Sequence, residues 1–112
     1  KPSSAASDVY KRQYYYLAEC YRSIGEYNRA LEYYRKVVEG WPDFENTWNA
    51  QFLIGYICNN LRKAGILPES EALTVTRMAY EKLLQRYPDC PAARAASDWL
   101  EHNVRSNKEN KR

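Results

Sequence analysis

Apolar and small residues recur along the first part of the chain with the spacing of an α-helix. They fall at Tyr14, Leu17, Ala18, Tyr21 and Ile24, which places them on one helical face. The glycine that follows suits the left-handed conformation in which many helices end. The pattern therefore predicts an amphipathic helix that ends at this glycine.

A second stripe of the same period follows almost at once. Its members are Tyr27, Ala30, Leu31, Tyr34, Val37 and Val38. Gly40 and Pro42 come directly after it and both oppose a continued helix. Because the joint between the two stripes is very short, the two helices are predicted to pack antiparallel as a hairpin.

A longer copy of this hairpin follows. The segment AQFLIGYICNNL aligns with YYYLAECYRSI, so that Ile54 and Gly55 take the positions of Leu17 and Ala18. Gly65 is expected to end this helix, and Pro68 to open the next one near its first turn.

The second helix of this copy is predicted to run into AYEKLLQRYPD. The copy has nine more residues between its small position and its closing proline than the first copy has. An insertion is therefore expected around residues 62–70. A fifth helix, PAARAASDWLEHNV, is predicted to close the fold through a narrow stripe of Ala92, Ala95, Ala96 and Trp99.

The hairpin unit resembles a tetratricopeptide repeat, a helix–turn–helix of about 34 residues. The positions that carry the resemblance are Tyr14, Leu17, Ala18, Tyr21, Gly25, Tyr27, Ala30, Tyr34 and Pro42 in the first copy, and Ile54, Gly55, Tyr80, Leu83 and Pro88 in the second. The small residues stand where two helix backbones come closest, because a larger side chain would push them apart. The resemblance implies an all-α fold of two repeats plus a closing helix, stacked as a short right-handed α-solenoid.

The expected domain organisation follows from these patterns. It has a non-native leader at 1–13, repeat 1 at 14–44, repeat 2 at 45–90, a closing helix at 91–104 and a disordered basic tail at 105–112. Residues 3–13, SSAASDVYKRQ, match the translation of a transposon-type sequencing-library adapter residue for residue. This match predicts an open reading frame assembled from environmental DNA without trimming. The leader is still expected to extend the first helix, since it contains no helix breaker.

The net charge of +3 comes from the two ends of the chain. Residues 14–104 carry 10 basic and 12 acidic side chains, so this body has a charge of −2. A nucleic-acid partner is not expected, because such partners need basic residues clustered on a folded face. The longest apolar run is far shorter than the roughly 20 residues of a membrane span. Cys20, Cys58 and Cys90 lack metal-site or paired spacing and are expected to be bystander thiols.

Catalytic chemistry has no support in the sequence. It contains no phosphate-binding loop, metalloprotease motif or nucleophile elbow. His102 is the single histidine, and Glu69 and Glu71 would point to different faces of a helix. The chain is predicted to be no enzyme and to need no cofactor and no metal.

The resemblance implies a scaffold that holds a peptide or a neighbouring subunit in a concave groove lined by the first helix of each repeat. The groove residues would be Tyr15, Glu19, Arg22 and Ser23 in repeat 1 and Phe52, Tyr56, Asn59 and Asn60 in repeat 2. Packing of Phe52 and Tyr56 inside the fold is the alternative. The expected partner is a protein or peptide, or adjacent repeats of a larger bacterial parent chain.

Two other functions stay open. RYPDCPAARAA resembles the repeat junctions of bacterial envelope proteins, which would make the chain a cell-envelope assembly or lipoprotein-associated subunit and slightly favours the periplasm. The chain would otherwise be a docking or regulatory arm of an enzyme whose catalytic domain lies upstream. Because repeat arrays usually need about three units, a further repeat is expected upstream, packed on the YYYL cluster at 14–17.

Overall fold

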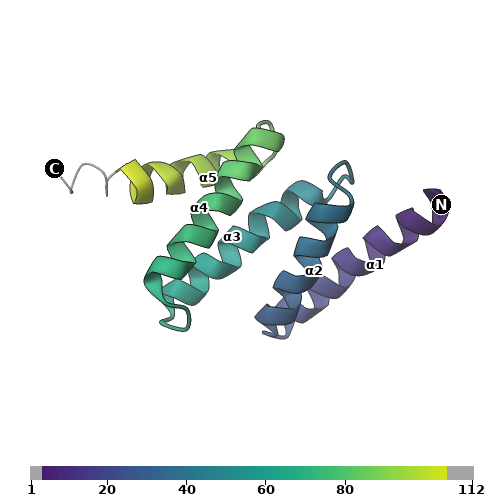
Figure 1. Ribbon diagram of the computed structural model, residues 1–112, viewed down its shortest axis with the longest axis horizontal. Helices are drawn as coiled ribbons and strands as arrows, with labels where there is room; N and C mark the ends of the chain where they lie inside the picture. The colour runs from purple at the N-terminus through teal and green to yellow at the C-terminus, as the bar shows by residue number, and fades with distance from the viewer. Residues whose placement is uncertain (1–3, 106–112) are drawn as a thin grey trace. The chain divides into compact units, whose positions relative to one another are not determined.

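The computed structural model describes residues 4–105, and over that range the chain forms helices and turns without any strand (Figure 1). The elements are α1 (Ser4–Ser23), α2 (Tyr27–Gly40), α3 (Thr47–Lys63), α4 (Glu69–Arg86), α5 (Ala93–Leu100) and the π-helical turn η1 (Glu101–Arg105). The predicted all-α fold is confirmed. Residues 1–3 of the expected leader and 106–112 of the expected tail lie outside the described range.

The chain divides into two compact units, Lys1–Ala50 and Gln51–Arg112, and the division falls within α3. The first unit contains α1, α2 and the start of α3. The second contains the rest of α3 with α4, α5 and η1. Because α1 begins at Ser4, its helix runs from the expected leader into Tyr14 without interruption.

In the first unit, α1 and α2 form the predicted antiparallel hairpin (Figure 1). Gly25 has a φ of 81° and donates its N–H to the carbonyl of Arg22 at 3.1 Å. The N–H of Glu26 reaches the carbonyl of Tyr21 at 2.8 Å. These two bonds make a Schellman motif, which satisfies the last carbonyls of α1 and turns the chain into α2.

Small residues and aromatic rings hold this hairpin together. Ala18 and Ala30, the two small positions of the predicted repeat, are fully buried. The ring of Tyr33 on α2 lies nearly parallel to that of Tyr21 on α1, with centroids 5.7 Å apart, and tilts against Tyr14 at 5.8 Å. The hairpin is therefore stabilised by close contacts at its small residues and by packing between the aromatic rings of its two helices.

The second unit turns by the same device. Gly65 has a φ of 75°, its N–H bonds to Arg62 at 3.0 Å, and the N–H of Ile66 bonds to Leu61 at 2.9 Å. Pro68 then precedes the first residue of α4, in the extended conformation that suits an N-cap. The extra length of this copy lies in its helices as well as in its turn. Its second helix, α4, has 18 residues, whereas α2, the second helix of the first copy, has 14.

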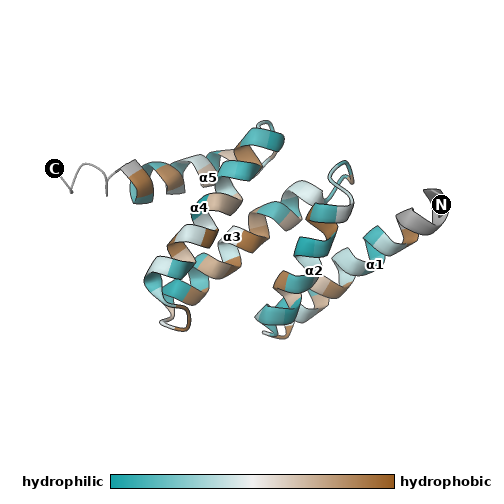
Figure 2. Ribbon diagram, in the orientation of Figure 1, coloured by the Kyte–Doolittle hydropathy of each residue, from teal (hydrophilic) through white to brown (hydrophobic). Residues whose placement is uncertain are grey.

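Within the second unit, α3 and α4 approach each other closely at Gly55. A Cβ atom on Gly55 would lie 2.6 Å from Cε1 of Tyr80 and 3.2 Å from Cβ of Ala79. Two buried polar side chains fasten the same contact: Thr76 donates to the carbonyl of Gly55 at 3.2 Å, and Gln51 donates to the carbonyl of Ala79 at 3.0 Å. Figure 2 shows that the middle of α3 is strongly hydrophobic, as a helix packed in this way requires.

The closing helix begins at Ala93 and its helical backbone continues through η1 to Arg105. Ala92 and Ala96 are buried and Trp99 is partly buried, but Ala95 is exposed. The expected stripe was therefore wrong at Ala95. The helix is short, and it packs through Ala92, Ala96 and Trp99, which are spaced four and three residues apart, rather than through a wider face.

A methyl group at Gly55 should destabilise the protein. We expect Gly55→Ala to lower the free energy of unfolding by about 1–3 kcal/mol, because the new Cβ collides with the buried ring of Tyr80. Gly40→Ala is the matched control, since a Cβ on this other helical glycine meets nothing within 4 Å. Urea unfolding followed by circular dichroism measures both variants. Equal stability of the two would contradict the close approach.

Candidate protein-binding surfaces

Of the residues predicted to line a groove, Tyr15 lies inside the first unit. Its ring is buried and meets the rings of Tyr34 and Phe44 edge-on, at centroid distances of 6.2 and 6.0 Å. Its hydroxyl accepts a hydrogen bond from Asn49 Nδ2 at 2.6 Å. Tyr15 thus joins α1 to the chain that follows α2, and little of its side chain is left for a partner.

Glu19 and Arg22 are predicted groove residues that form a polar cluster with a buried tyrosine. The hydroxyl of Tyr34 donates to Glu19 Oε1, Arg22 Nε donates to that hydroxyl at 2.9 Å, and Arg22 Nη2 pairs with Glu19 Oε2 at 3.1 Å. Burial, reinforced by the bond to Glu19, raises the pKa of Tyr34 well above its usual value. Ser23 is exposed and bonds to the carbonyl of Cys20 at 2.8 Å. The charged side chains of Glu19 and Arg22 therefore bind Tyr34 and connect the two helices of the hairpin.

In the second unit, Asn59 is buried and belongs to the packing of the closing helix. Its Oδ1 accepts a hydrogen bond from Trp99 Nε1 at 3.1 Å and from Arg62 Nη2 at 3.0 Å. Arg62 also pairs with Glu69 at 3.1 Å. The amide that was expected to hold a peptide instead holds α5.

Phe52 and Tyr56 contribute to a stack of rings on α3 and α4. Phe52 lies nearly parallel to Tyr80 at 5.4 Å and stacks on Tyr56 at 5.6 Å, while Trp99 meets Tyr80 edge-on at 5.5 Å. Phe52 is therefore partly covered, whereas Tyr56 and its neighbour Asn60 remain exposed. Burial also raises the pKa of Tyr80 well above its usual value.

One apolar surface of the first unit runs along α1 and is partly exposed. We call it the outer stripe and define it by five residues spaced alternately four and three apart: Tyr10, Tyr14, Leu17, Tyr21 and Ile24. Tyr10, Leu17 and Ile24 are 52%, 38% and 71% exposed, and Tyr14 and Tyr21 are partly exposed. Gln13 and Cys20, which lie on the same face, carry no charge and are exposed.

The corresponding positions of the second copy are buried. Ile54, Cys58 and Leu61 align with Leu17, Tyr21 and Ile24, and all three are covered. The positions of Leu17 and Ile24 in the repeat pattern are thus exposed in the first copy, whereas the aligned positions of the second copy are packed. Sequence periodicity identified both stripes, but it could not tell which of them has a covering surface.

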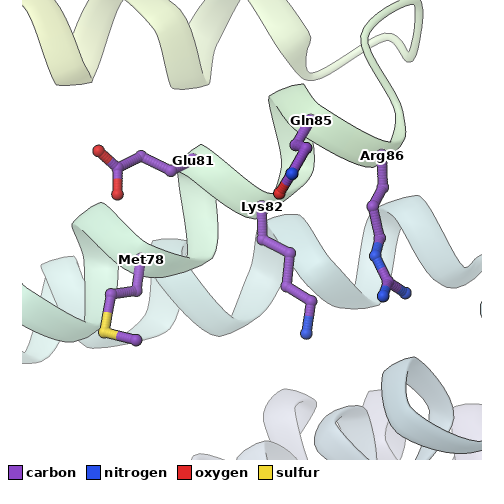
Figure 3. Close-up of a pocket in the computed structure, with 5 residues that line it drawn as sticks. All are labelled: Met78, Glu81, Lys82, Gln85 and Arg86. Atoms are coloured by element: carbon purple, nitrogen blue, oxygen red, sulfur yellow. The ribbon is translucent and has the colours of Figure 1, made fainter.

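A shallow hollow of about 430 Å³ lies along α4 in the second unit (Figure 3). It is lined by Met78, Glu81, Lys82, Gln85 and Arg86, which all project from one helix. Arg77 binds Glu81 at 3.0 Å and partly neutralises its charge. The hollow mixes one apolar side chain with both signs of charge, so it shows no convergent chemistry for a small ligand.

The described part of the chain contains neither a candidate metal site nor a candidate membrane-spanning helix. Residues 4–105 contain no cluster of three or more histidine, cysteine or carboxylate side chains placed to hold a metal ion. None of the described helices combines the length and apolar character needed to cross a bilayer. His102 bonds to the carbonyl of Asp98 at 2.8 Å on the exposed side of η1.

Comparison with protein-family models matches residues 12–43 to the family described as tetratricopeptide repeat. The match covers α1 from Arg12, the turn at Gly25, α2 and the first residues after it. It begins two residues before Tyr14, within the expected leader. No curated protein and no solved structure matches the chain significantly.

Removal of the Asn59 amide should loosen the closing helix. We expect Asn59→Ala to lower the free energy of unfolding by about 1–3 kcal/mol, because the partly buried indole N–H of Trp99 loses its acceptor. Trp99 fluorescence, read in a chain with Trp41→Phe and Trp48→Phe, should shift to longer wavelength as the ring gains water. The exposed neighbour provides the control, Asn60→Ala. An unchanged spectrum in Asn59→Ala would refute the structural role of Asn59.

Stability should fall at alkaline pH through the buried tyrosines. Because the pKa of Tyr80 is raised in the folded state, its contribution is complete below the unfolded pKa of about 10 and is lost as pH rises above it. Tyr80→Phe should therefore lose less stability than the wild type between about pH 10 and 11, by up to about 1.4 kcal/mol. Denaturant titrations at each pH measure this difference. Equal losses of stability in Tyr80→Phe and the wild type over this range would contradict the prediction.

Proposed function

Because residues 12–43 belong to the tetratricopeptide repeat family, we propose that the chain is a non-catalytic protein–protein interaction module whose main docking surface is the outer stripe of α1. The family match supports a protein-binding role in general. The choice of surface rests on the exposure of Leu17 and Ile24 on a single helical face, since both residues lie outside the expected leader.

The outer stripe has the properties of a docking surface for a helix. Apolar side chains at alternating spacings of three and four form the seam along which two helices pack. Each apolar side chain that a partner covers contributes about 25 cal/mol for every square ångström removed from water. The aligned residues of the second copy, Ile54, Cys58 and Leu61, are buried. This burial supports a docking role for the outer stripe, because it shows that these positions of the repeat suit a packed environment.

The predicted groove contributes less than the sequence analysis expected. Tyr15 and Asn59 are buried, and Glu19 and Arg22 are committed to the cluster with Tyr34. We assign contacts with an extended peptide to the predicted residues that keep exposed side chains, which are Ser23 on α1 and Tyr56 and Asn60 on α3.

A peptide selection tests the proposal. A displayed library of amphipathic peptides, each long enough for three or four helical turns, is selected for binding to the wild-type chain. The affinity of the selected peptides is then measured by titration calorimetry. We expect them to bind Ile24→Glu at least about tenfold more weakly, because the carboxylate would lose water against an apolar helix face. Ile66→Glu is the matched control: Ile66 is 67% exposed and also flanks a Schellman glycine.

Two results decide whether the outer stripe is the docking surface. Loss of binding in Ile24→Glu with full binding in Ile66→Glu supports the outer stripe as the docking surface. Peptides that bind both variants as tightly as the wild type would overturn it.

A further inference from the structure

We propose that α5 is a detachable intramolecular ligand, and that the site holding its Trp99 indole binds a tryptophan-bearing helix of a partner protein when α5 leaves. We call this site the indole socket and define it by Phe52, Asn59, Arg62 and Tyr80. All four residues come from α3 and α4 of the second unit, so the socket does not depend on the outer stripe.

The polar part of the indole socket is complete without α5. Asn59 Oδ1 accepts a hydrogen bond from Trp99 Nε1 at 3.1 Å, but it also accepts from Arg62 Nε at 3.3 Å and Nη2 at 3.0 Å. Arg62 in turn pairs with Glu69, the first residue of α4, at 3.1 Å. The arginine therefore keeps the amide oxygen in place when Trp99 departs, and an incoming N–H group meets an acceptor that is already positioned.

The aromatic part of the socket is also fixed by α3 and α4. Phe52 lies nearly parallel to Tyr80, with ring centroids 5.4 Å apart, and holds the orientation of that ring. Trp99 meets Tyr80 edge-on at 5.5 Å, with an interplanar angle of 82°. An indole supplies both a ring for Tyr80 and an N–H donor for the amide, whereas phenylalanine and leucine lack the donor. The socket therefore selects a tryptophan.

The helix that now fills the socket is weakly attached. Over residues 91–104, Ala92 and Ala96 are the only buried residues, and Trp99 is partly buried. No side chain caps the N-terminus of α5. Its helical backbone ends at Arg105, so it is no longer than the isolated helices of about 12–15 residues that are marginal in water. A terminal element with so few buried contacts opens without unfolding the rest of the fold.

The way α5 is seated defines the chemistry of a competing partner. Two small residues, Ala92 and Ala96, let the helix come close to the hairpin, and Trp99 follows three residues later. A larger side chain at either alanine position would push the helix away and withdraw the indole. The partner is therefore a helix with two small residues and a tryptophan at spacings of four and three, and not any helix with an apolar face.

A peptide added in trans tests the socket. It has the sequence of residues 91–105 and a fluorescent label, and it is titrated into the full-length wild type and into full-length Trp99→Ala. Because Trp99→Ala has no indole of its own to compete, we expect a dissociation constant of about 10 μM to 1 mM for this variant. Binding to the wild type should be at least about tenfold weaker, since its socket is occupied.

Two altered peptides provide matched controls on the Trp99→Ala chain. A peptide with Ala95→Gln should bind like the parent peptide, because Ala95 is exposed in the structure. A peptide with Trp99→Phe should bind about tenfold more weakly, because it cannot donate to Asn59. Full-length Ala96→Glu is a second test chain: a charge at this buried position displaces α5 and leaves the socket side chains unchanged.

Hydrogen exchange of the wild type measures the detachment itself. Amides of α5 and η1 should exchange at least about tenfold faster than those of α3 beside the socket, through an opening that depends little on denaturant. Exchange of both sets through one global unfolding step would overturn the detachable helix.

The remaining outcomes also decide the proposal. Preferential binding of the parent peptide to Trp99→Ala and Ala96→Glu, with loss of affinity in the Trp99→Phe peptide, supports the indole socket. Failure of both chains to bind the peptide overturns it. Loss of the circular dichroism signal of a folded chain in both variants overturns it as well, because a detachable helix is not needed for the rest of the fold.

Discussion

Two helices can pack closely only where one of them contributes almost no side chain, and the second unit is organised around such a point. Gly55 lets the backbone of α3 come within contact distance of the ring of Tyr80 on α4. That ring is then held from both sides, by Phe52 in parallel and by Trp99 edge-on. The indole of Trp99, which contacts this ring, also donates a hydrogen bond to Asn59 on α3. A single missing side chain thus underlies the contacts of three helices.

Much of this arrangement was accessible from the sequence, because it depends on local periodicity and on glycine. The hairpins, the turns at Gly25 and Gly65 and the small positions at Ala18, Ala30 and Gly55 all follow from spacing and from backbone conformation. What covers each face does not follow from spacing. Tyr15 and Asn59 lie on the predicted faces of their helices, but other parts of the fold bury them. Buried hydrogen bonds of Gln51 and Thr76 also escaped prediction, since isolated polar residues in a helix usually point to solvent.

The two copies of the hairpin illustrate the difference between a packing position and a binding position. Leu17 and Ile24 occupy the same slots as Ile54 and Leu61, yet the first pair is exposed and the second is buried. The chemistry of the side chains is nearly the same in both. Whether such a position contributes to stability or to recognition therefore depends on what packs against it.

Tyrosine explains how such a stripe can remain open to water. In Figure 2 most of α1 is pale rather than brown, because three of the five residues of the outer stripe are tyrosines and score as only weakly polar. A tyrosine ring supplies a large apolar surface to a partner, while its hydroxyl keeps one edge hydrated in the free chain. Leucine or isoleucine at the same three positions would strengthen docking, but it would also leave a strongly apolar patch on the unbound protein. The tyrosine-rich stripe is therefore suited to association that is reversible, in which the free and the bound states both have to be soluble and folded.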